Sequence, residues 1–446
     1  MAYLYPLPYL NRSVQTFSAP VFTQTTITTT ANSSTATVGS AAGLSSGMYV
    51  SSANVPPGTT IAEINGTTIT MTQNAYASGS NTPAYFAVLQ TWIKPNDAKL
   101  IRVRLWGGGG GGSGGCTNAT STIRPGGPGG GSGGVLDRWF GAEQLDGAVP
   151  VAIGHGGAGG LGATTANTSG GTGFTAGGTA FGSVVCVRGG GGGSAATGGA
   201  SPSGSGGGGP MGGNAGGANT TGVASNGVPS GIQSTSSEIG SGGGAAGGAW
   251  NAANVPTAGG GGGLFLPPVN YIPGGVGGGI TASATIPTNG SSTGLSVDGG
   301  PVGASGGGGG ACVAQSRGGG AMTSGSATLT YTSAVTNLVA GASGTIVHSA
   351  AAGFPTGVVR VSAITTNSGT GTCTVTLSAP ATANFSNQTI YFVASNGVSH
   401  NGANGGAPGG GGGGGGAGTS DGGVVQVSAG NGGAGGAGAA IIESYW

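Results

Sequence analysis

Short stretches in which apolar and polar residues alternate occur near the start of the chain. In residues 25–28 and 68–72, Ile and Met alternate with Thr, and turn signals at Pro56-Pro57-Gly58 and Asn65-Gly66 separate such stretches. Alternation bounded by Asn-Gly is typical of β-hairpins. Residues 24–90 are therefore predicted to form a small antiparallel β module.

The same module occurs a second time. Residues 75–88, AYASGSNTPAYFAV, align without a gap with residues 381–394, ATANFSNQTIYFVA. This internal similarity predicts a second copy of the module over residues 326–395. Glycine-rich sequence lies on both sides of that copy, so we interpret it as an insertion into a glycine-rich body made of residues 91–325 and 396–446.

The glycine-rich body alternates glycine runs with segments of ordinary composition. The apolar residues show no sustained helical period, and each glycine inside a helix costs about 1 kcal/mol relative to alanine. About twelve runs are present, near residues 107–115, 126–134, 156–160, 189–193, 206–217, 242–248, 259–263, 274–279, 306–310, 318–320, 409–416 and 432–438. A flexible linker would normally mix Ser with Gly and would not need so many runs.

Neighbouring glycine runs can supply hydrogen-bond partners for one another's backbone groups. In polyproline II geometry the backbone N–H and C=O groups point outward with no internal partner, and without Cβ atoms such helices can approach closely enough to bond to each other. The predicted fold class is therefore mostly β and irregular, with small antiparallel β modules, a glycine-rich polyglycine II helix bundle and very little α-helix.

Composition and charge exclude several other classes of protein. The chain has 111 Gly and 22 Pro among 446 residues, with only 10 basic and 9 acidic residues and a net charge of +1. Uninterrupted glycine runs break the triplet repeat of collagen, and a near-neutral chain of this hydropathy differs from a charged disordered tail. So few basic residues predict no nucleic-acid partner, and the lack of a long apolar run predicts no membrane insertion.

Residues 1–23 are rich in Tyr and Pro and contain aromatic residues that would be costly to expose. We interpret this segment as an arm that docks on another protein; a strand that packs on its own chain is an equally weighted alternative. The candidate docking residues are Tyr3, Tyr5, Tyr9, Phe17 and Phe22.

Catalytic, metal and cofactor motifs are not convincing in this chain. Three G-x-S-x-G matches, at residues 111–115, 130–134 and 303–307, are expected from glycine abundance and do not lie between a strand and a helix. The acidic residues Asp137, Glu143 and Asp146 are interpreted as part of a solvated loop rather than as glycosidase carboxylates. No catalytic residue, metal site or cofactor is predicted. The three histidines, His155, His348 and His400, are isolated in the sequence, and His155 is expected to make a structural hydrogen bond. The four cysteines are expected to be small buried apolar residues: Cys116, Cys186, Cys312 and Cys373.

Bulky residues between the glycine runs are candidates for recognition. A rigid scaffold that displays variable loops is a common way to build a binding surface, and aromatic residues are favoured contacts. The alternative is that each is tucked against neighbouring glycine helices or a sister subunit. The candidates are Trp139, Phe140, Trp250, Phe265 and Tyr271.

The order of motifs resembles a known family. Residues 92–106, with WIKP and KLIRVRLW before six glycines, resemble the opening of the glycine-rich domain of bacteriophage tail fibre proteins, and residues 151–160 and 178–193 follow the order of that family. Residues 432–446 look like its closing strand. The similarity covers residues 91–320 and 397–446. More distantly, the alternation of glycine runs with variable segments is similar to the tip adhesins of T-even phage long tail fibres, which lack the N-terminal arm and the two β modules.

This resemblance implies a non-enzymatic adhesin of the phage tail. The N-terminal arm would bind other virion tail proteins, and the loops of the bundle would bind a bacterial surface receptor, either a glycan or an outer-membrane protein. The family also implies a homotrimer that is made in the host cytoplasm and exposed on the virion. The alternatives are a structural fibre or decoration protein without a receptor contact and, less favoured, a depolymerase of surface glycan.

Overall fold

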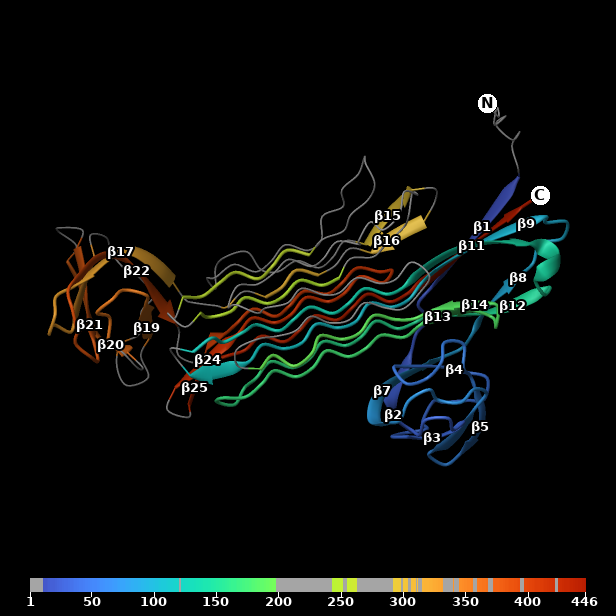
Figure 1. Ribbon diagram of the computed structural model, residues 1–446, viewed down its shortest axis with the longest axis horizontal. Helices are drawn as coiled ribbons and strands as arrows, with labels where there is room; N and C mark the ends of the chain where they lie inside the picture. Colours follow the sequence, from blue (N-terminus) through green and yellow to red (C-terminus); the bar gives the residue numbers. More distant parts are fainter. Residues whose placement is uncertain are drawn as a thin grey trace, which may run out of the picture.

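The computed structural model describes residues 11–119, 122–197, 243–251, 255–262, 292–297, 300–303, 306–309, 311, 315–331, 340, 345–355, 359–367, 372–393, 397–421 and 424–446. The molecule is elongated, with β structure at both ends and long irregular segments running between them (Figure 1). Within the described residues the only helical element is the short 3-10 helix Ala142–Gln144. The predicted class, mostly β and irregular with very little helix, is confirmed.

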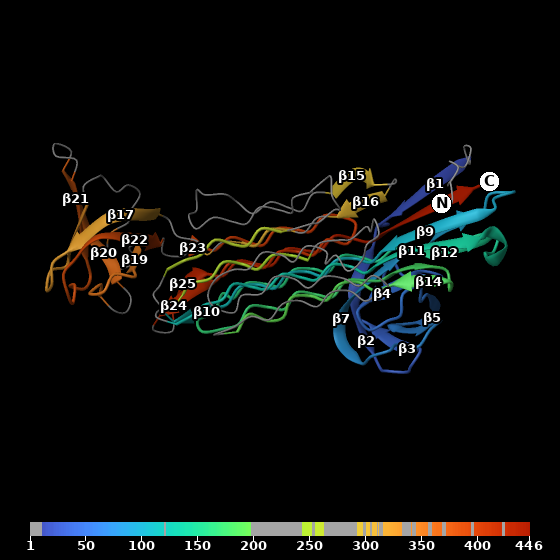
Figure 2. The ribbon, with the colours of Figure 1, turned by 45° about the horizontal axis from the view of Figure 1, so that its top comes forward.

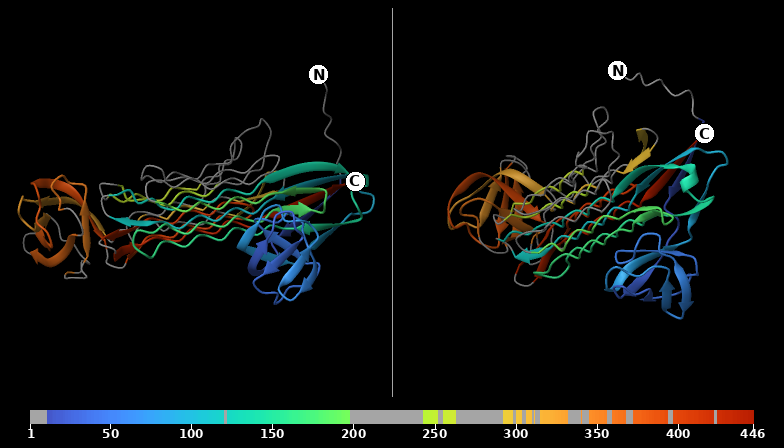
Figure 3. Two further views of the ribbon diagram at one scale, coloured as in Figure 1. Left: turned by 60° about the horizontal axis from the view of Figure 1, so that its bottom comes forward. Right: turned by 45° about the vertical axis from the view of Figure 1, so that its right-hand side comes forward.

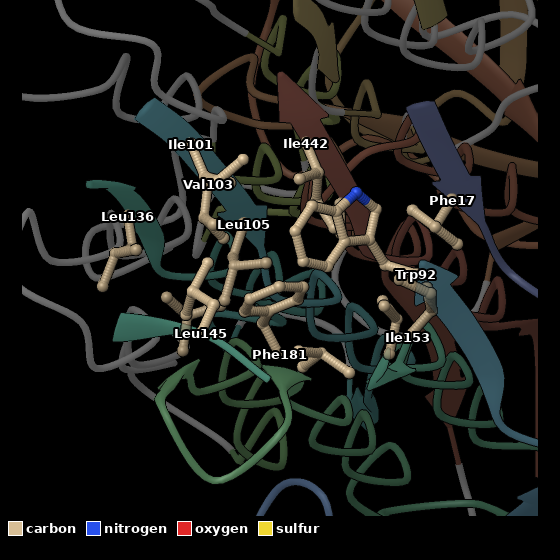
Figure 4. Close-up of a cluster of buried hydrophobic side chains, with 14 of the residues drawn as sticks. Phe17, Trp92, Ile101, Val103, Leu105, Leu136, Leu145, Ile153, Phe181 and Ile442 are labelled. Atoms are coloured by element: carbon tan, nitrogen blue, oxygen red, sulfur yellow. The ribbon is translucent and has the colours of Figure 1, made fainter. Parts of the chain in front are cut away.

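Two four-stranded sheets form a sandwich at the end that holds the first and last described strands, and we call this end the base. One sheet has the order β1-β26-β9-β11, with bounds Arg12–Ser18, Ala439–Tyr445, Leu100–Trp106 and Val135–Gly141. The other has the order β14-β13-β12-β8, with bounds Val185–Val187, Thr179–Phe181, Ala148–Ala152 and Gln90–Ile93. Alternation along β9 sends one set of side chains inward. They meet residues of the second sheet in a core that includes Ile101, Val103, Leu105, Trp92 and Phe181 (Figure 4).

The N-terminal β module packs beside the base (Figure 2). Its strand order is β4-β7-β2-β3-β6-β5. The bounds of β2 to β7 are Thr23–Thr29, Thr35–Val38, Tyr49–Ser52, Ile61–Asn65, Thr68–Met71 and Gly79–Ala87. Ile27, Ile69 and Phe86 are fully buried in its core.

The inserted module lies at the opposite end of the molecule and forms a closed barrel (Figures 1 and 3). The bounds of β17 to β22 are Gln315–Met322, Thr328–Tyr331, Ile346–Ser349, Val359–Asn367, Thr372–Leu377 and Phe385–Val393. Read from β19, the order is β19-β22-β17-β18-β21-β20, which is the order of the N-terminal module strand for strand. We refer to it as the distal barrel.

Individual contacts also repeat between the two modules. The N–H of Ala75 donates to the carbonyl of Ser33, and at the equivalent place Ala381 donates to Ser326, both at 2.9 Å. Asn81 and Asn387, which align in the sequence, both have left-handed backbones, with φ of 50° and 54°. Asn tolerates this conformation better than most residues, so the repeated sequence encodes the same local turn twice.

The glycine runs connect the two ends. From Gly107 to Gly115, successive N–H groups donate in turn to three antiparallel segments, residues 128–134, 171–177 and 430–436. Bonds three residues apart reach the same segment: Gly109 donates to Gly436 at 2.8 Å, Gly112 to Gly433 at 2.9 Å and Gly115 to Gly430 at 3.0 Å. The carbonyls of the same run accept from three further segments, within residues 157–163, 190–193 and 412–415. Each turn of this run is thus bonded to six neighbours.

Close packing explains why these positions are glycine. A Cβ placed on Gly110 would lie 2.1 Å from the carbonyl oxygen of Gly191, and one on Gly112 would lie 2.1 Å from that of Gly413. Both obstacles are backbone atoms, which cannot rotate away. Even a methyl group would force the runs apart.

Four short strands lie where the runs reach the distal end. Their order is β10-β24-β25-β23, with bounds Thr117–Ala119, Gly418–Asp421, Val424–Ser428 and Gly397–Val398. A separate hairpin, β15 (Ser292–Val297) with β16 (Gly300–Gly303), lies alongside the bundle toward the base (Figure 1).

The cysteines do not share one environment. Cys116 and Cys373 are buried, as expected, and Cys312 lies outside the described residues. Cys186 is exposed, so the expectation of burial is wrong for it. The reason is its place on β14, the edge strand of its sheet, where it points away from the base core while Val187 points inward.

Candidate attachment and recognition surfaces

The N-terminal segment is a strand of its own chain from Arg12 onward. β1 pairs with β26 along its whole length, from Arg12 opposite Tyr445 to Ser18 opposite Ala439. Phe17 is buried in the base core. The alternative of a strand packed on its own chain therefore holds for this part, and Phe17 is not available to dock on another protein.

Phe22 is likewise occupied within the chain. Its ring makes edge contacts with Tyr49, Tyr85 and His155, with centroids 6.0–6.3 Å apart. It helps to hold the N-terminal module against the glycine-rich body, and its docking on a partner stays a prediction because the side chain is only partly buried. Tyr3, Tyr5 and Tyr9 lie outside the described residues.

His155 joins the N-terminal module to the first glycine runs. Its Nδ1 lies 2.7 Å from Ser51 Oγ, and its ring stacks on Tyr85 with centroids 3.8 Å apart. The predicted structural hydrogen bond is confirmed. Burial lowers the pKa of His155 to about 3, because a charged imidazolium would lose its hydration there. At neutral pH the ring is an uncharged packing element.

Trp139 and Phe140 lie on β11 in the base and not in a loop at the distal end. Trp139 is 51% exposed and packs against Tyr445, with centroids 5.2 Å apart, while the guanidinium of Arg102 lies 5.4 Å from its ring. Phe140 is partly buried against the base core. Of this pair only Trp139 offers a large exposed surface, and this surface is on the base.

Two of the three acidic residues predicted to form a solvated loop, Asp137 and Glu143, are part of ordered elements, whereas Asp146 lies in an exposed segment outside strand and helix. Asp137 accepts from Arg102 Nε at 3.0 Å and from Arg102 Nη2 at 2.6 Å, across the β9–β11 pair. Glu143 lies in the 3-10 helix that follows β11. The loop interpretation is wrong for Asp137, because residues 135–141 form the edge strand β11 of the sheet, and it is confirmed for Asp146.

A second, fully buried ion pair lies next to it. Arg104 donates to Glu443 across the β9–β26 pair, and both side chains are inaccessible to solvent. The hydroxyl of Tyr445 also donates to Glu443. Arg104 Nε and Nη1 have no hydrogen-bond partner in the described part of the chain. The opening and closing strands of the glycine-rich body are thus linked by a buried charge pair as well as by backbone bonds.

Trp250 is fully buried at the distal end of the bundle. Its ring lies between the guanidinium of Arg124, 5.2 Å away, and the ring of His348, 5.5 Å away. Apolar neighbours come from both bodies, among them Ile346 and Val393 of the distal barrel. A direct receptor contact by Trp250 is therefore excluded in this structure, because the ring fills the joint between bundle and barrel.

Burial lowers the pKa of the two titratable groups at this joint, Arg124 and His348. Desolvation lowers the pKa of Arg124 to about 9, and burial together with the charge of Arg124 lowers the pKa of His348 to about 3. Arg124 keeps a polar partner, since its Nη1 donates to Thr419 Oγ1 at 2.9 Å. Phe265 and Tyr271, the other two recognition candidates, lie outside the described residues.

Two features of the surface were not anticipated from the sequence. Leu161, 72% exposed, and Phe174 project from adjacent glycine-rich segments, which are joined by a bond from Gly171 N–H to the Leu161 carbonyl. A groove of about 510 Å³ opens on the distal barrel between β17, β18 and β22. The bulky residues inside glycine runs could have signalled the first feature, whereas the Ser and Thr residues of the groove have no distinctive spacing.

The G-x-S-x-G matches that were attributed to chance can be located in part in the structure. Ser113 and Ser132, the central residues of two G-x-S-x-G matches, are fully buried inside glycine runs. The third, Ser305, lies outside the described residues. Among the described residues no three His, Cys, Asp or Glu side chains gather as a metal site would require.

No protein-family model and no curated protein matches the chain. Within the described residues no helix is long and apolar enough to cross a membrane.

Proposed function

We propose that this chain is a bacteriophage tail fibre adhesin whose stem is a polyglycine II bundle. The bundle is supported by the hydrogen bonds of residues 107–115, which repeat every three residues and reach six neighbouring segments. A three-residue repeat with outward-pointing backbone groups is the geometry of the polyproline II helix. Residues 412–417 follow the same rule, since their N–H groups donate in turn to the segments around 110–113, 400–403 and 245–248.

The observation that carries the proposal is the polarity of the molecule. β1 and β26 are paired in the base, and the distal barrel lies at the other end of the stem (Figure 1). An arm that begins before Arg12 would attach the base to other virion tail proteins, which leaves the barrel and the distal loops directed toward the bacterial surface. Such a division into a fixed end, a stem and a free end is what an adhesin requires.

This polarity changes the roles of the candidate aromatic residues. Trp139 is assigned to the virion side, because it lies in the same sheet as β1 and β26. Tyr3, Tyr5 and Tyr9 remain candidates for docking, and Phe265 and Tyr271 remain candidates for receptor contact. Recognition would otherwise fall to the distal barrel, which belongs to the inserted module.

The quaternary state implied by the family resemblance is a homotrimer, and we retain it as part of the proposal. The exposed Leu161 and Phe174 on the side of the stem are suitable for contact between subunits, because large apolar side chains are favoured where surfaces meet. Sedimentation equilibrium of the full chain would give the mass directly. A monomeric mass at micromolar concentration would remove the trimer from the proposal.

Binding to whole bacteria tests the function. Purified full-length chain is expected to bind cells of the phage host saturably and to reduce adsorption of the phage in competition. Bovine serum albumin at equal mass concentration serves as the control for non-specific protein. Absence of saturable binding, with the chain shown by electron microscopy to be on the virion, would favour the purely structural fibre. Shortening of surface glycan during incubation would instead favour a depolymerase.

A further inference from the structure

We infer that the groove on the distal barrel binds an uncharged saccharide unit of a bacterial surface glycan, with Phe385 as the platform for the sugar ring. This inference rests on the proposed adhesin function and specifies its ligand class and its site. The groove has a volume of about 510 Å³, which falls in the range of about 300–1,000 Å³ typical of small-molecule sites.

The chemistry of the lining points to a neutral polyol. The groove is lined by Thr323, Thr328, Thr330, Asn384, Phe385 and Ser386, among others, and no lining residue is ionisable. Hydroxyl and amide groups both donate and accept hydrogen bonds, as the hydroxyls of a sugar do. An anionic ligand would find no cation here, and an acyl chain would find too many polar groups.

The aromatic platform, Phe385, is held in place by residues of the barrel core. Phe385 is partly buried, and its ring packs against Phe354 with centroids 6.1 Å apart. Met322, opposite Phe385 in the β17–β22 ladder, is buried in the barrel core. A fixed apolar ring face surrounded by polar groups matches a sugar ring, which has an apolar C–H face and polar edges.

Polar groups around the platform are oriented as well. Asn384 Oδ1 accepts from the N–H of Ser324 at 2.7 Å, which fixes the amide, while its amide nitrogen has no partner among the described residues. Thr330 Oγ1 donates to the carbonyl of Ala321 at 3.2 Å, so its lone pairs remain available to accept. The groove therefore offers at least one oriented donor and one oriented acceptor before any ligand binds.

The N-terminal module provides an internal comparison. There the N–H of Ala31 donates to Ser78 Oγ at 2.9 Å, which is the equivalent of the Ser324–Asn384 bond. The residue equivalent to Phe385 is Gly79, and Asn54 Nδ2 lies 2.0 Å from the place of its missing Cβ. The two modules share a fold and a rim of hydroxyl groups, but only the distal copy has the platform.

Two variants of the full chain test the site. Ser386→Arg places a long side chain at an exposed position of the groove, and Ser80→Arg makes the matched change in the N-terminal module, where position 80 is also exposed. Binding to protein-free polysaccharide extracted from the host surface is measured by biolayer interferometry. Ser386→Arg is expected to weaken binding by at least about tenfold because it fills the groove, whereas Ser80→Arg leaves binding unchanged. Phe385→Leu, which keeps an apolar side chain over the barrel core, is expected to weaken it roughly three- to tenfold.

The outcomes separate this inference from the proposed function. Undiminished polysaccharide binding by Ser386→Arg would overturn the groove as the site. Saturable binding to cells that is lost on protease treatment of the cells, with no binding to polysaccharide, would overturn the saccharide and leave the adhesin. Binding only to a polysaccharide fraction that loses its affinity when its acidic groups are removed would overturn the uncharged ligand. Absence of any saturable binding to cells would count against the adhesin itself.

Discussion

A single methyl group has no room inside the glycine runs, and this makes glycine identity a direct determinant of stability. The Cβ of Gly112→Ala would lie 2.1 Å from the carbonyl oxygen of Gly413. Gly147 is the control, because nothing lies within 4 Å of its would-be Cβ and its backbone is not left-handed. We expect Gly112→Ala to lower the free energy of unfolding by about 3 kcal/mol, as overpacking does. Gly147→Ala should raise it by about 0.4–1 kcal/mol, because alanine restricts the unfolded chain.

Urea denaturation followed by circular dichroism measures both changes. Equal stability of the two variants would contradict the close packing of residues 107–115.

The buried histidines predict a loss of stability in acid. His155 and His348 both have a pKa near 3 in the folded chain, well below the ordinary value of about 6.5. Between these values the unfolded chain binds more protons than the folded one, so stability is fully present above pH 6.5 and falls as the pH decreases toward 3. Each histidine contributes a slope of about 1.4 kcal/mol per pH unit in this window.

Replacing one histidine should remove its share of the slope. His155→Gln is expected to reduce the pH dependence between pH 6 and 4 by about 1.4 kcal/mol per unit, measured by urea unfolding at each pH. The half-buried His400 is the control, since its pKa is lowered less severely. A slope unchanged by His155→Gln would show that this ring becomes protonated without unfolding.

At the scale of elements, the closing strand β26 holds the base together from its centre. It lies between β1 and β9 and carries Glu443, whose buried partner Arg104 lies on the adjacent strand β9. Removing the charge from one member of a buried pair leaves the other uncompensated, and this typically costs about 3–5 kcal/mol. Glu443→Gln is therefore expected to lower the free energy of unfolding by about 3 kcal/mol at pH 7.

The neighbouring pair on the same sheet is the matched control. Arg102 and Asp137 form a two-bond ion pair that retains partial exposure, with side chains 17% and 25% accessible. Solvent screens such a pair, so Asp137→Asn should cost at most about 1 kcal/mol. Thermal unfolding by differential scanning calorimetry compares the two variants. If Asp137→Asn proved the more damaging change, burial would not be what sets the strength of these pairs.

The elements with regular alternation could be predicted from the sequence, but their partners in space could not. Alternation along residues 101–105 identifies the inward face of β9, and the two β modules follow from their Thr-rich runs and turns. The local sequence does not indicate that Arg104, on the opposite face of β9, is buried. Its burial depends on its partner Glu443, which lies 339 positions away in the chain. The sequence leaves open whether Trp250 packs inside the molecule for the same reason: its environment comes from Arg124 and from the distal barrel. The groove was missed because Ser and Thr are common throughout the chain, and only the fold brings six of its lining residues around Phe385.

At the scale of the whole molecule, the distal barrel is an insertion whose two ends lie next to each other. Its first and last strands, β17 and β22, pair antiparallel with Gln315 opposite Phe392, so the chain enters and leaves at neighbouring points. The glycine runs that precede and follow it are bonded to other runs in the stem, for example Gly306 to Gly411 and Gly402 to Asn431. The stem and base therefore contain their own stabilising interactions without the barrel.

Replacing residues 315–393 by a short Gly-Ser linker tests this arrangement, with Trp250→Ser included so that the joint does not leave an apolar ring exposed. We expect the remaining chain to stay folded, because the base core and the bonds of residues 107–115 are untouched, and to lose binding to the surface glycan, because the groove is gone. Size-exclusion chromatography and circular dichroism report on folding, and biolayer interferometry on binding. The full-length Trp250→Ser variant is the control, since it keeps the groove. A shortened chain that folds and still binds the polysaccharide would transfer recognition from the barrel to the stem loops, whereas one that cannot fold would show that the joint around Trp250 is part of the stem's own stability.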